Sequence, residues 1–270
     1  MATLTSEELD RYARHLVLDG FGLRGQKRLK ESSVLIIGAG GLGSPASLYL
    51  AAAGVGKLGL VDGDAVDVSN LQRQIAHSSA DVGRPKVESA ADKLRALNPF
   101  AEVVEHGQMA AADNILELVR GYDVVLDGTD TFAAKYLIND ACVLAGLPYV
   151  HAGILRYQGQ VLSYVPGKGP CLRCVFPTPP APGDVPTCRE AGVIGAMAGV
   201  VGSMQAMEAI KLLADVGEPL VGRMFVYDAL KGDARTVKLP PAREDCAVCG
   251  SSPSITELRD IEQEACAWHI

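Results

Sequence analysis

The sequence predicts an α/β protein with a doubly wound sheet, parallel in its N-terminal part and continued by antiparallel strands. Three features carry this prediction: a strand, a glycine-rich turn and a helix in succession, further short strands that end in aspartate, and fewer helices between strands after residue 149. Alternating strands and helices favour a parallel sheet, because each crossover must return over one face of the sheet.

The N-terminal unit spans residues 33–53. Residues 33–37 are apolar and largely β-branched, residues 38–43 read Gly-Ala-Gly-Gly-Leu-Gly, and residues 44–53 are rich in alanine. This order predicts a buried strand, a tight turn and a helix. Further strands are predicted at 57–61, which ends at Asp62, and at 122–126, which ends at Asp127.

The second half of the chain has fewer predicted helices between its strands. Strands are predicted at 150–154, 160–165 and 223–227, and we expect them to extend the sheet in antiparallel fashion. The proline-rich segment 177–186 is incompatible with regular structure and is expected to form a surface loop. Small apolar residues at 191–210, interrupted by polar ones, predict a buried helix.

Composition excludes two classes of partner. With 270 residues, 48% of them hydrophobic, the chain can bury a substantial core. A formal net charge of -7 opposes sequence-independent binding of nucleic acid or anionic lipid, which needs a basic face. Charges within residues 1–18 exclude a signal-peptide core, and no apolar stretch suits a membrane span. Seven cysteines, an odd number, fit a reducing compartment, so we expect a cytoplasmic location.

The glycine-rich turn predicts a phosphate site. Gly38, Gly40, Gly41 and Gly43 let the backbone approach a phosphate at the N-terminus of the following helix, whose N–H groups and dipole favour negative charge. Asp62 ends the next strand, where an acid can bond a ribose. Together these features indicate an adenosine compound without saying which, and a turn with no ligand is the alternative.

Two cations follow the ribose acid. Arg73 lies in the segment 67–74, which is rich in amide side chains, and Lys86 follows it. They suit a triphosphate, and Asp130, at the carboxyl end of a strand, suits Mg²⁺. A polar loop with a solvated lysine is the competing interpretation.

Taken together, these motifs resemble the ThiF/MoeB/HesA family of ubiquitin-activating-type adenylyltransferases, which have a Rossmann-like fold. The resemblance runs from Arg11 to Gly250. Its most specific part is Ser-Asn-Leu-Gln-Arg-Gln at 69–74 after Asp-Gly-Asp at 62–64, supported by Arg-Tyr-Ala-Arg-His at 11–15 and Asp-Gly-Thr-Asp at 127–130.

The resemblance implies contacts with ATP and its magnesium. With the glycine turn, the expected nucleotide-binding residues are Gly38, Gly40, Gly41, Gly43, Asp62, Asp64, Ser69, Asn70, Leu71, Gln72, Arg73, Gln74, Lys86, Asp130 and Thr131. The expected catalytic residues are Arg14, Arg73, Lys86, Asp130 and Cys188. Arg14 is implied to reach the partner subunit's site, hence a homodimer. Thr131 departs from the family's more frequent asparagine.

Two Cys-x-x-Cys pairs predict a metal centre. Cys171, Cys174, Cys246 and Cys249 suit a closed, structural tetrahedral Zn²⁺ site, whereas a redox role would not explain two pairs. Cys188, beyond the proline-rich loop, matches the family's candidate for a covalent link to the carrier, with an ordinary loop cysteine as the alternative.

The predicted activity is ATP-dependent adenylation of the C-terminal glycine carboxylate of a small ubiquitin-like sulfur-carrier protein ending in Gly-Gly. No rhodanese domain follows in this sequence, so a separate sulfur donor, a rhodanese or a cysteine desulfurase, is expected. Two alternatives stay open. An NAD-dependent oxidoreductase would bind nicotinamide, and a non-catalytic nucleotide-binding scaffold would bind ATP without pyrophosphate exchange.

The predicted organisation is one adenylyltransferase domain over residues 1–250. Its nucleotide-binding part is expected at about 30–150, and its carrier-binding and zinc part at about 151–250. Ile255, Leu258, Ile261 and Ala265 recur at helical spacing, so residues 251–270 are expected to form a helical tail.

Overall fold

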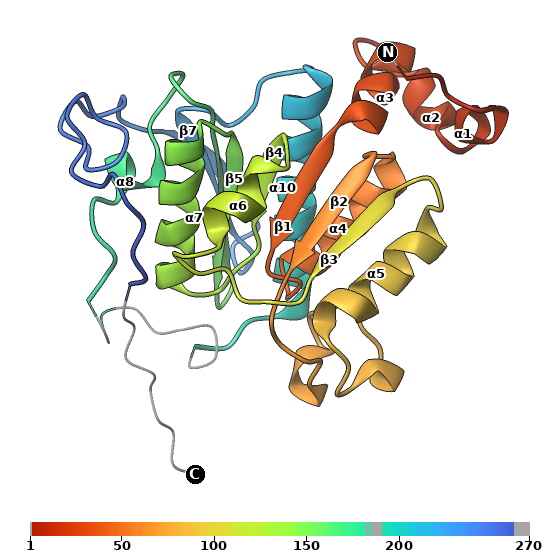
Figure 1. Cartoon of the computed structure of the whole chain (residues 1–270), viewed down its shortest axis with the longest axis horizontal. Coiled ribbons are helices and arrows are strands. Elements are labelled where there is room, and N and C mark those ends of the chain that lie inside the picture. The colour runs from red at the N-terminus through yellow and green to blue at the C-terminus, as the bar shows by residue number, and fades with distance from the viewer. Residues whose placement is uncertain (1, 182–183, 185–190, 262–270) are drawn as a thin grey trace.

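One eight-stranded sheet organises the chain, with strand order β3-β2-β1-β4-β5-β6-β7-β8 (Figure 1). The computed structural model describes residues 2–181, 184 and 191–261. The strands are β1 Ser33–Ile37, β2 Lys57–Val61, β3 Glu102–His106, β4 Val124–Asp127, β5 Tyr149–Leu155, β6 Gln158–Tyr164, β7 Arg223–Asp228 and β8 Asp233–Lys238. This architecture confirms the predicted fold class.

The sheet changes from parallel to antiparallel one strand later than expected. Strands β1 to β5 pair in parallel, and β6, β7 and β8 are antiparallel. β5 therefore belongs to the parallel half, because α7 crosses over between β4 and β5 and returns the chain in the same direction.

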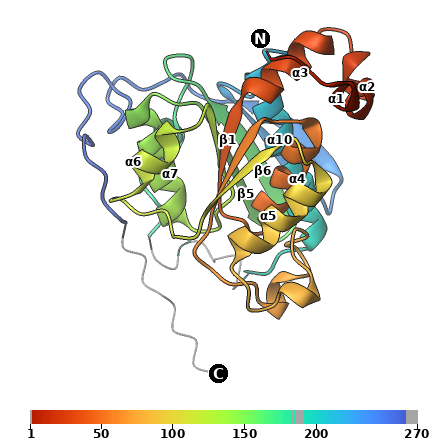
Figure 2. The ribbon, with the colours of Figure 1, turned by 45° about the vertical axis from the view of Figure 1, so that its right-hand side comes forward.

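Helices cover both faces of the sheet (Figure 2). Helices α3, α4, α5 and α10 pack on one face, and α6 and α7 pack on the other. The helices of the described residues are α1 Ser6–Arg11, α2 Ala13–Leu16, α3 Gly22–Glu31, α4 Gly43–Ala53, α5 Lys86–Leu97, α6 Ile115–Arg120, α7 Phe132–Ala145, α8 Leu172–Val175 and α10 Gly195–Ala214. Both faces of β1 are therefore buried, with Leu35 in one core cluster and Ile36 in the other.

Helix α10 is the predicted buried helix of small residues. It packs against α4 and against the parallel half of the sheet, which small side chains permit because they let backbones approach closely. Gly202 shows how close the approach is: a Cβ there would lie 2.4 Å from the carbonyl oxygen of Leu42. In the residues described, no helix is both long and apolar enough to cross a membrane.

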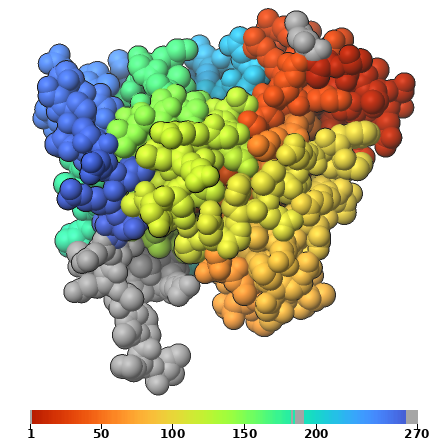
Figure 3. Space-filling view, viewed as in Figure 1, coloured from red at the N-terminus to blue at the C-terminus, as the bar shows by residue number. Residues whose placement is uncertain are grey.

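The expected C-terminal helix is not formed over residues 254–261, and the remainder, with Cys266, lies outside the described residues. Ile255 and Leu258 instead pack on the core cluster beneath α6 and α7, and the carboxylate of Asp260 accepts a hydrogen bond from the Ala112 N–H at 2.9 Å. Figure 3 shows this segment, in dark blue, lying against the rest of the molecule. Contacts with the domain surface therefore replace the helical ladder that the spacing predicted.

Candidate active site

The glycine-rich turn is held tightly between β4 and α4. Gly38 has a φ of +97°, and a Cβ on it would lie 2.8 Å from the carbonyl oxygen of Gly128. A Cβ on Gly43 would lie 1.8 Å from the Gly38 carbonyl oxygen. Within the described part of the chain, the N–H groups of Gly40, Gly41 and Leu42 have no hydrogen-bond acceptor. These N–H groups stand at the first turn of α4, the arrangement that favours an anion.

The buried side chain of His77 contacts this turn. Nothing in the sequence around His77 indicated such a role. Its Nε2–H donates to the Ala39 carbonyl oxygen at 3.1 Å, and its Nδ1 accepts from the Ser89 hydroxyl at 2.9 Å. Burial lowers the pKa of His77 despite its hydrogen bond to Ala39. The imidazole is therefore neutral at pH 7, and its hydrogen bond to Ala39 stabilises the turn.

The structure brings Asp62, Asp64 and Lys86 together. The Asp62 carboxylate accepts hydrogen bonds from the N–H groups of Ala39 and Asp64, both at 2.9 Å. The Nζ atom of Lys86 lies 2.7 Å from Asp64 and 3.8 Å from Asp62. Burial raises the pKa of Asp62, although Lys86 and the two N–H groups oppose the shift. Lys86 is only 6% exposed, so its charge acts in a partly dehydrated setting.

Residues 67–74 form a capped turn beside the glycine-rich segment. Asp67 caps the short 3₁₀ helix Val68–Asn70, and Arg73 donates from Nη1 to the Ser69 carbonyl oxygen at 3.0 Å. Gln74 is buried, and no described residue donates to its Oε1 atom. Since a buried acceptor without a partner is costly, the site is suited to a ligand that carries a donor.

The remaining predicted members of this segment lie at its surface. Leu71 and Asn70 are half-buried, whereas Ser69 and Gln72 are exposed. The Gln72 backbone touches the start of α10, since a Cβ on Gly195 would lie 2.0 Å from the Gln72 carbonyl oxygen. The segment thus lies between the glycine-rich turn and α10, and its contacts with ATP stay a prediction.

The two acids at the carboxyl end of β4, Asp127 and Asp130, have opposite environments. Asp130 is exposed, and its carboxylate forms no hydrogen bond or ion pair with the described residues. Asp127 is fully buried and surrounded by partners. Thr131 caps α7, its hydroxyl accepting from the Ala134 N–H at 3.3 Å. The Asp130 carboxylate therefore has no partner among the described residues, whereas Thr131 has a structural partner of its own. The role of Asp130 as a ligand for Mg²⁺ stays a prediction.

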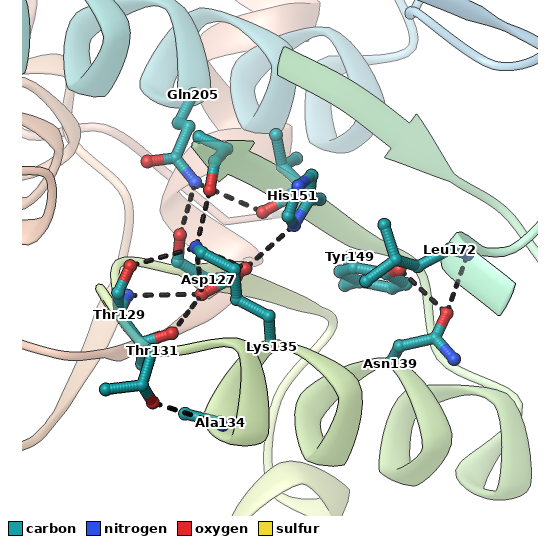
Figure 4. Close-up of polar contacts among 12 residues, drawn as sticks. Asp127, Thr129, Thr131, Ala134, Lys135, Asn139, Tyr149, His151, Leu172 and Gln205 are labelled. Atoms are coloured by element: carbon teal, nitrogen blue, oxygen red, sulfur yellow. Dashed lines mark hydrogen bonds and ion pairs between the residues drawn. The ribbon is translucent and has the colours of Figure 1, made fainter. Parts of the chain in front are cut away.

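A buried polar cluster around Asp127 was missed by the sequence analysis (Figure 4). The Nδ1–H of His151 donates to Asp127 at 2.9 Å, and Lys135 lies 3.0 Å from the same carboxylate oxygen. Burial raises the pKa of Asp127, but Lys135 and then His151 outweigh it and bring the pKa to about 2. Burial lowers the pKa of His151, so Lys135 supplies the compensating positive charge.

No local spacing could have revealed this cluster, because its members come from β4, α7 and β5. Only the pairing of β4 with β5 and the packing of α7 over them bring the three side chains together.

Arg14 is not brought to the site within its own chain. It is exposed on α2, and Figure 1 shows α1 and α2 beyond the amino-terminal end of β1, whereas the glycine-rich turn follows its carboxyl end. Next to α2, a groove of about 340 Å³ runs between α4 and α10. Apolar side chains are exposed around it, including Tyr49 at 59% and Met207 at 50%.

The four paired cysteines converge on one point. Their Sγ atoms lie within 4.8 Å of one another, with separations of 3.8 Å for Cys171–Cys174, 3.6 Å for Cys171–Cys246 and 3.3 Å for Cys174–Cys249. Four thiolates bound to one metal at ~2.3 Å would be about 3.8 Å apart, whereas a disulfide needs ~2.05 Å. The geometry therefore fits a tetrahedral metal site and excludes disulfides among these residues.

Cys188 lies outside the described residues. The base of its loop is described: the Tyr136 hydroxyl lies 2.9 Å from the Phe176 carbonyl oxygen and 2.7 Å from that of Thr178. Arg173 forms two 2.7 Å hydrogen bonds to Asp140. As expected, the described residues of the proline-rich segment have no helix or strand.

The chain is similar in sequence to known proteins over almost its whole length. A model of the ThiF family matches residues 12–248. The chain is 50% identical over 261 residues to the Bos taurus protein named adenylyltransferase and sulfurtransferase MOCS3, covering 97% of this chain and 57% of that protein. It is 50% identical over 266 residues to a probable adenylyltransferase/sulfurtransferase MoeZ of Mycobacterium tuberculosis, covering 97% and 66%. The chain thus spans between half and two thirds of the length of these relatives.

Solved structures show the same fold. A crystal structure of E. coli MccB with MccA-N7isoASN superposes with a TM-score of 0.81 at 25% identity, covering 92% of this chain and 76% of that one. E. coli MccB with ATP gives a TM-score of 0.77 at 26% identity, covering 89% and 74%. The residues that the ThiF-family model matches include the glycine-rich turn, the end of β4 and three of the four paired cysteines, Cys171, Cys174 and Cys246.

Proposed function

This chain belongs to the ThiF family, and from that premise we propose that it adenylates the C-terminal carboxylate of a small ubiquitin-like sulfur-carrier protein ending in Gly-Gly. One observation carries the proposal. At the carboxyl ends of the parallel strands, the glycine-rich turn lies beside Arg73, is linked through Asp62 to Lys86, and packs against Gly128 in the loop that carries Asp130. Among the described residues, the N–H groups of that turn lack acceptors and the Asp130 carboxylate lacks a partner. The names of MOCS3 and MoeZ support both an adenylyltransferase activity and a link to sulfur transfer.

In the proposed reaction, an oxygen of the carrier's glycine carboxylate attacks the α-phosphorus of ATP. The bond from that phosphorus to the bridging oxygen breaks, and its electron pair leaves with pyrophosphate. The product is a carrier acyl-adenylate. No side-chain base is needed, because the carboxylate is already ionised at pH 7.

The rate enhancement is assigned to positioning and to stabilisation of negative charge. Arg73 and Lys86 would stabilise the charge on the phosphates, and Asp130 would hold Mg²⁺, which when bound would neutralise the leaving pyrophosphate. The N–H groups of the glycine-rich turn bind the nucleotide phosphates. Carrier-dependent exchange of labelled pyrophosphate into ATP tests this function directly.

We also propose that the enzyme is a homodimer whose sites are completed by Arg14 of the partner subunit. The exposed apolar side chains around the α4–α10 groove support a second copy as the occupant of that face, because such side chains gain from burial. The remoteness of Arg14 from its own site supports an exchange of arginines between subunits.

Complementation tests the shared site. Arg14→Ala and Asp130→Ala chains should each be inactive, yet a mixture should recover about one quarter of the wild-type exchange rate, because half the dimers are mixed and each has one intact site. An Arg73→Ala and Asp130→Ala mixture is the control and should recover nothing, since both residues act within one subunit. A monomeric enzyme in sedimentation velocity, or equal recovery in both mixtures, contradicts the shared site.

Cys188 is proposed to form a covalent intermediate. Its thiolate would attack the acyl carbon of the carrier adenylate, form a thioester and expel AMP. With a sulfur donor, a rhodanese or a cysteine desulfurase, the Cys188 thiolate would instead attack the outer sulfur of the donor's persulfide and release the donor's thiolate. The resulting Cys188 persulfide would attack the acyl carbon of the carrier adenylate, form an acyl-persulfide linkage and expel AMP. The proposal places this chemistry in the cytoplasm, where thiols stay reduced.

Cys188→Ala should therefore leave pyrophosphate exchange unchanged, because adenylation needs no thiol. The same variant should lose any enzyme–carrier adduct detected by intact-mass spectrometry. Cys142→Ala, which removes a buried thiol elsewhere, should keep the adduct. If the wild-type enzyme with carrier, ATP and a sulfur donor forms no adduct, Cys188 has no covalent role.

A further inference from the structure

Asp130 lies in a short loop, residues 128–131, which is held in place by hydrogen bonds to neighbouring strands. The Asp130 side chain has no partner among the described residues, so its position depends on the backbone of residues 128–131. The Gly128 N–H donates to the Ile37 carbonyl oxygen at 2.8 Å, and the Thr129 N–H donates to Asp127 at 3.1 Å. The anchor for the second bond is the buried carboxylate of Asp127.

Lys135 connects this loop to the rest of the sheet. Its Nζ atom lies 2.9 Å from the Thr129 carbonyl oxygen, 2.6 Å from the Ala152 carbonyl oxygen in β5, and 3.3 and 3.0 Å from the two Asp127 oxygens. The side chain extends from the first turn of α7, as Figure 4 shows. One ammonium group thus joins the loop, the end of β4 and the middle of β5.

Other partners hold Asp127 from two further sides. The Thr129 hydroxyl donates to its Oδ1 at 2.6 Å, and His151 donates to its Oδ2. Gln205 of α10 donates from Nε2 to the Asp127 carbonyl oxygen at 2.8 Å. With both carboxylate oxygens occupied and no exposed surface, Asp127 cannot serve as a ligand to a cation bound at the surface of the loop.

We infer that Lys135 is a positioning residue that, through Asp127 and Thr129, fixes the loop bearing Asp130 in the geometry that adenylation needs. Burying a lysine that is only 8% exposed is costly unless its charge is paired, and Lys135 is paired with Asp127, the acid that accepts two hydrogen bonds from Thr129 in the loop. The inference rests on the proposed function for its catalytic part, and on geometry alone for its structural part.

The structural part is tested by hydrogen–deuterium exchange of the enzyme without substrates. Lys135→Met should accelerate exchange in a peptide covering residues 128–131, because the Thr129 contacts lose their anchor. Lys211→Met is the matched control: it removes the lysine partner of another buried acid, Glu208, at the far end of α10. That variant should leave exchange at 128–131 unchanged.

The catalytic part is tested by pyrophosphate exchange with the same variants. Lys135→Met should lower kcat about 10- to 100-fold, as loss of supporting contacts around a metal ligand commonly does. The Mg²⁺ concentration for half-maximal rate should rise, with little change in the KM for ATP. Lys135→Arg, which keeps charge and donors, should recover most of the rate. If Lys135→Met does not fold, the double variant Asp127→Asn/Lys135→Met, which removes both buried charges, is measured in its place.

Two outcomes overturn the inference: unchanged deuterium uptake at 128–131, or a loss of kcat no larger than that of Lys211→Met. A wild-type enzyme without pyrophosphate exchange would instead overturn the proposed function and the catalytic part together. The deuterium measurement would still decide whether Lys135 anchors the loop.

Discussion

Asp130→Ala should lower carrier-dependent pyrophosphate exchange by about 100- to 1,000-fold, the range found when one electrostatic stabiliser of a transition state is removed. The physical reason is the position of this carboxylate: it is exposed at the carboxyl end of β4 and unpartnered among the described residues. Its loss removes the group proposed to hold Mg²⁺ against the leaving pyrophosphate. The measurement is incorporation of labelled pyrophosphate into ATP at saturating carrier and ATP.

Arg73→Ala should cause a loss of similar size. The Arg73 guanidinium donates a hydrogen bond to the Ser69 carbonyl oxygen, and the aliphatic part of the side chain lies beside the glycine-rich turn, since a Cβ on Gly41 would lie 3.6 Å from its Cγ and Cδ atoms. Glu117→Ala and Arg120→Ala are matched controls, since both residues are exposed on α6. They remove one charge of each sign from the surface and should leave exchange within about two-fold of wild type.

Exchange that persists undiminished in both Asp130→Ala and Arg73→Ala would contradict the assignment of the site. Binding of ATP by the wild-type enzyme without any exchange in the presence of carrier would favour a nucleotide-binding scaffold. Binding of a nicotinamide dinucleotide in place of ATP would favour an oxidoreductase.

Cys246→Ser should lower both metal content and thermal stability. The four sulfurs are spaced for a tetrahedral metal, and we expect one Zn²⁺ per chain in metal analysis. The site joins the segment after β8 to the start of α8, so its loss releases the C-terminal part of the described chain from the core. A loss of ~3 kcal/mol corresponds to a fall in melting temperature of about 10 °C for a domain of this size.

Cys142→Ala is the control for this experiment. Cys142 is also buried, in α7, but lies outside the cluster of four sulfurs. Its replacement should leave one zinc bound per chain and lower the melting temperature only slightly, since the cavity created is small. A wild-type protein that contains no metal, and melts at the same temperature as Cys246→Ser, would rule out the zinc site.

Local patterns were sufficient for much of the fold. The predicted strands around the glycine-rich turn and the predicted helix at 44–53 are all present, because a buried parallel strand is a short apolar run and needs no partner to be recognised. β8 was missed since every residue in it is exposed, so it has no apolar pattern. β3 was missed because only Val103 in it is buried.

The predicted C-terminal helix was wrong over residues 254–261, although the apolar residues there have helical spacing. Ile255, Leu258 and Ile261 have helical spacing, yet each packs against the domain in a segment without helical structure. A spacing of three residues states only that one side of a segment is apolar. Which backbone conformation presents that side depends on the surface that receives it.

The sequence by itself determined the glycine-rich turn, the cysteine pairs, the segment 69–74 and the family, because each of these depends on residues close together in the chain. The sequence singled out Asp130 rather than Asp127 as a ligand for Mg²⁺, but only the tertiary structure gives the environments of the two acids. Lys135 and His151, from separate elements, enclose Asp127 at the end of β4, whereas Asp130 is exposed. Burial and charge pairing are properties of the packed molecule, and they separate the two carboxylates into an anchor and a candidate ligand.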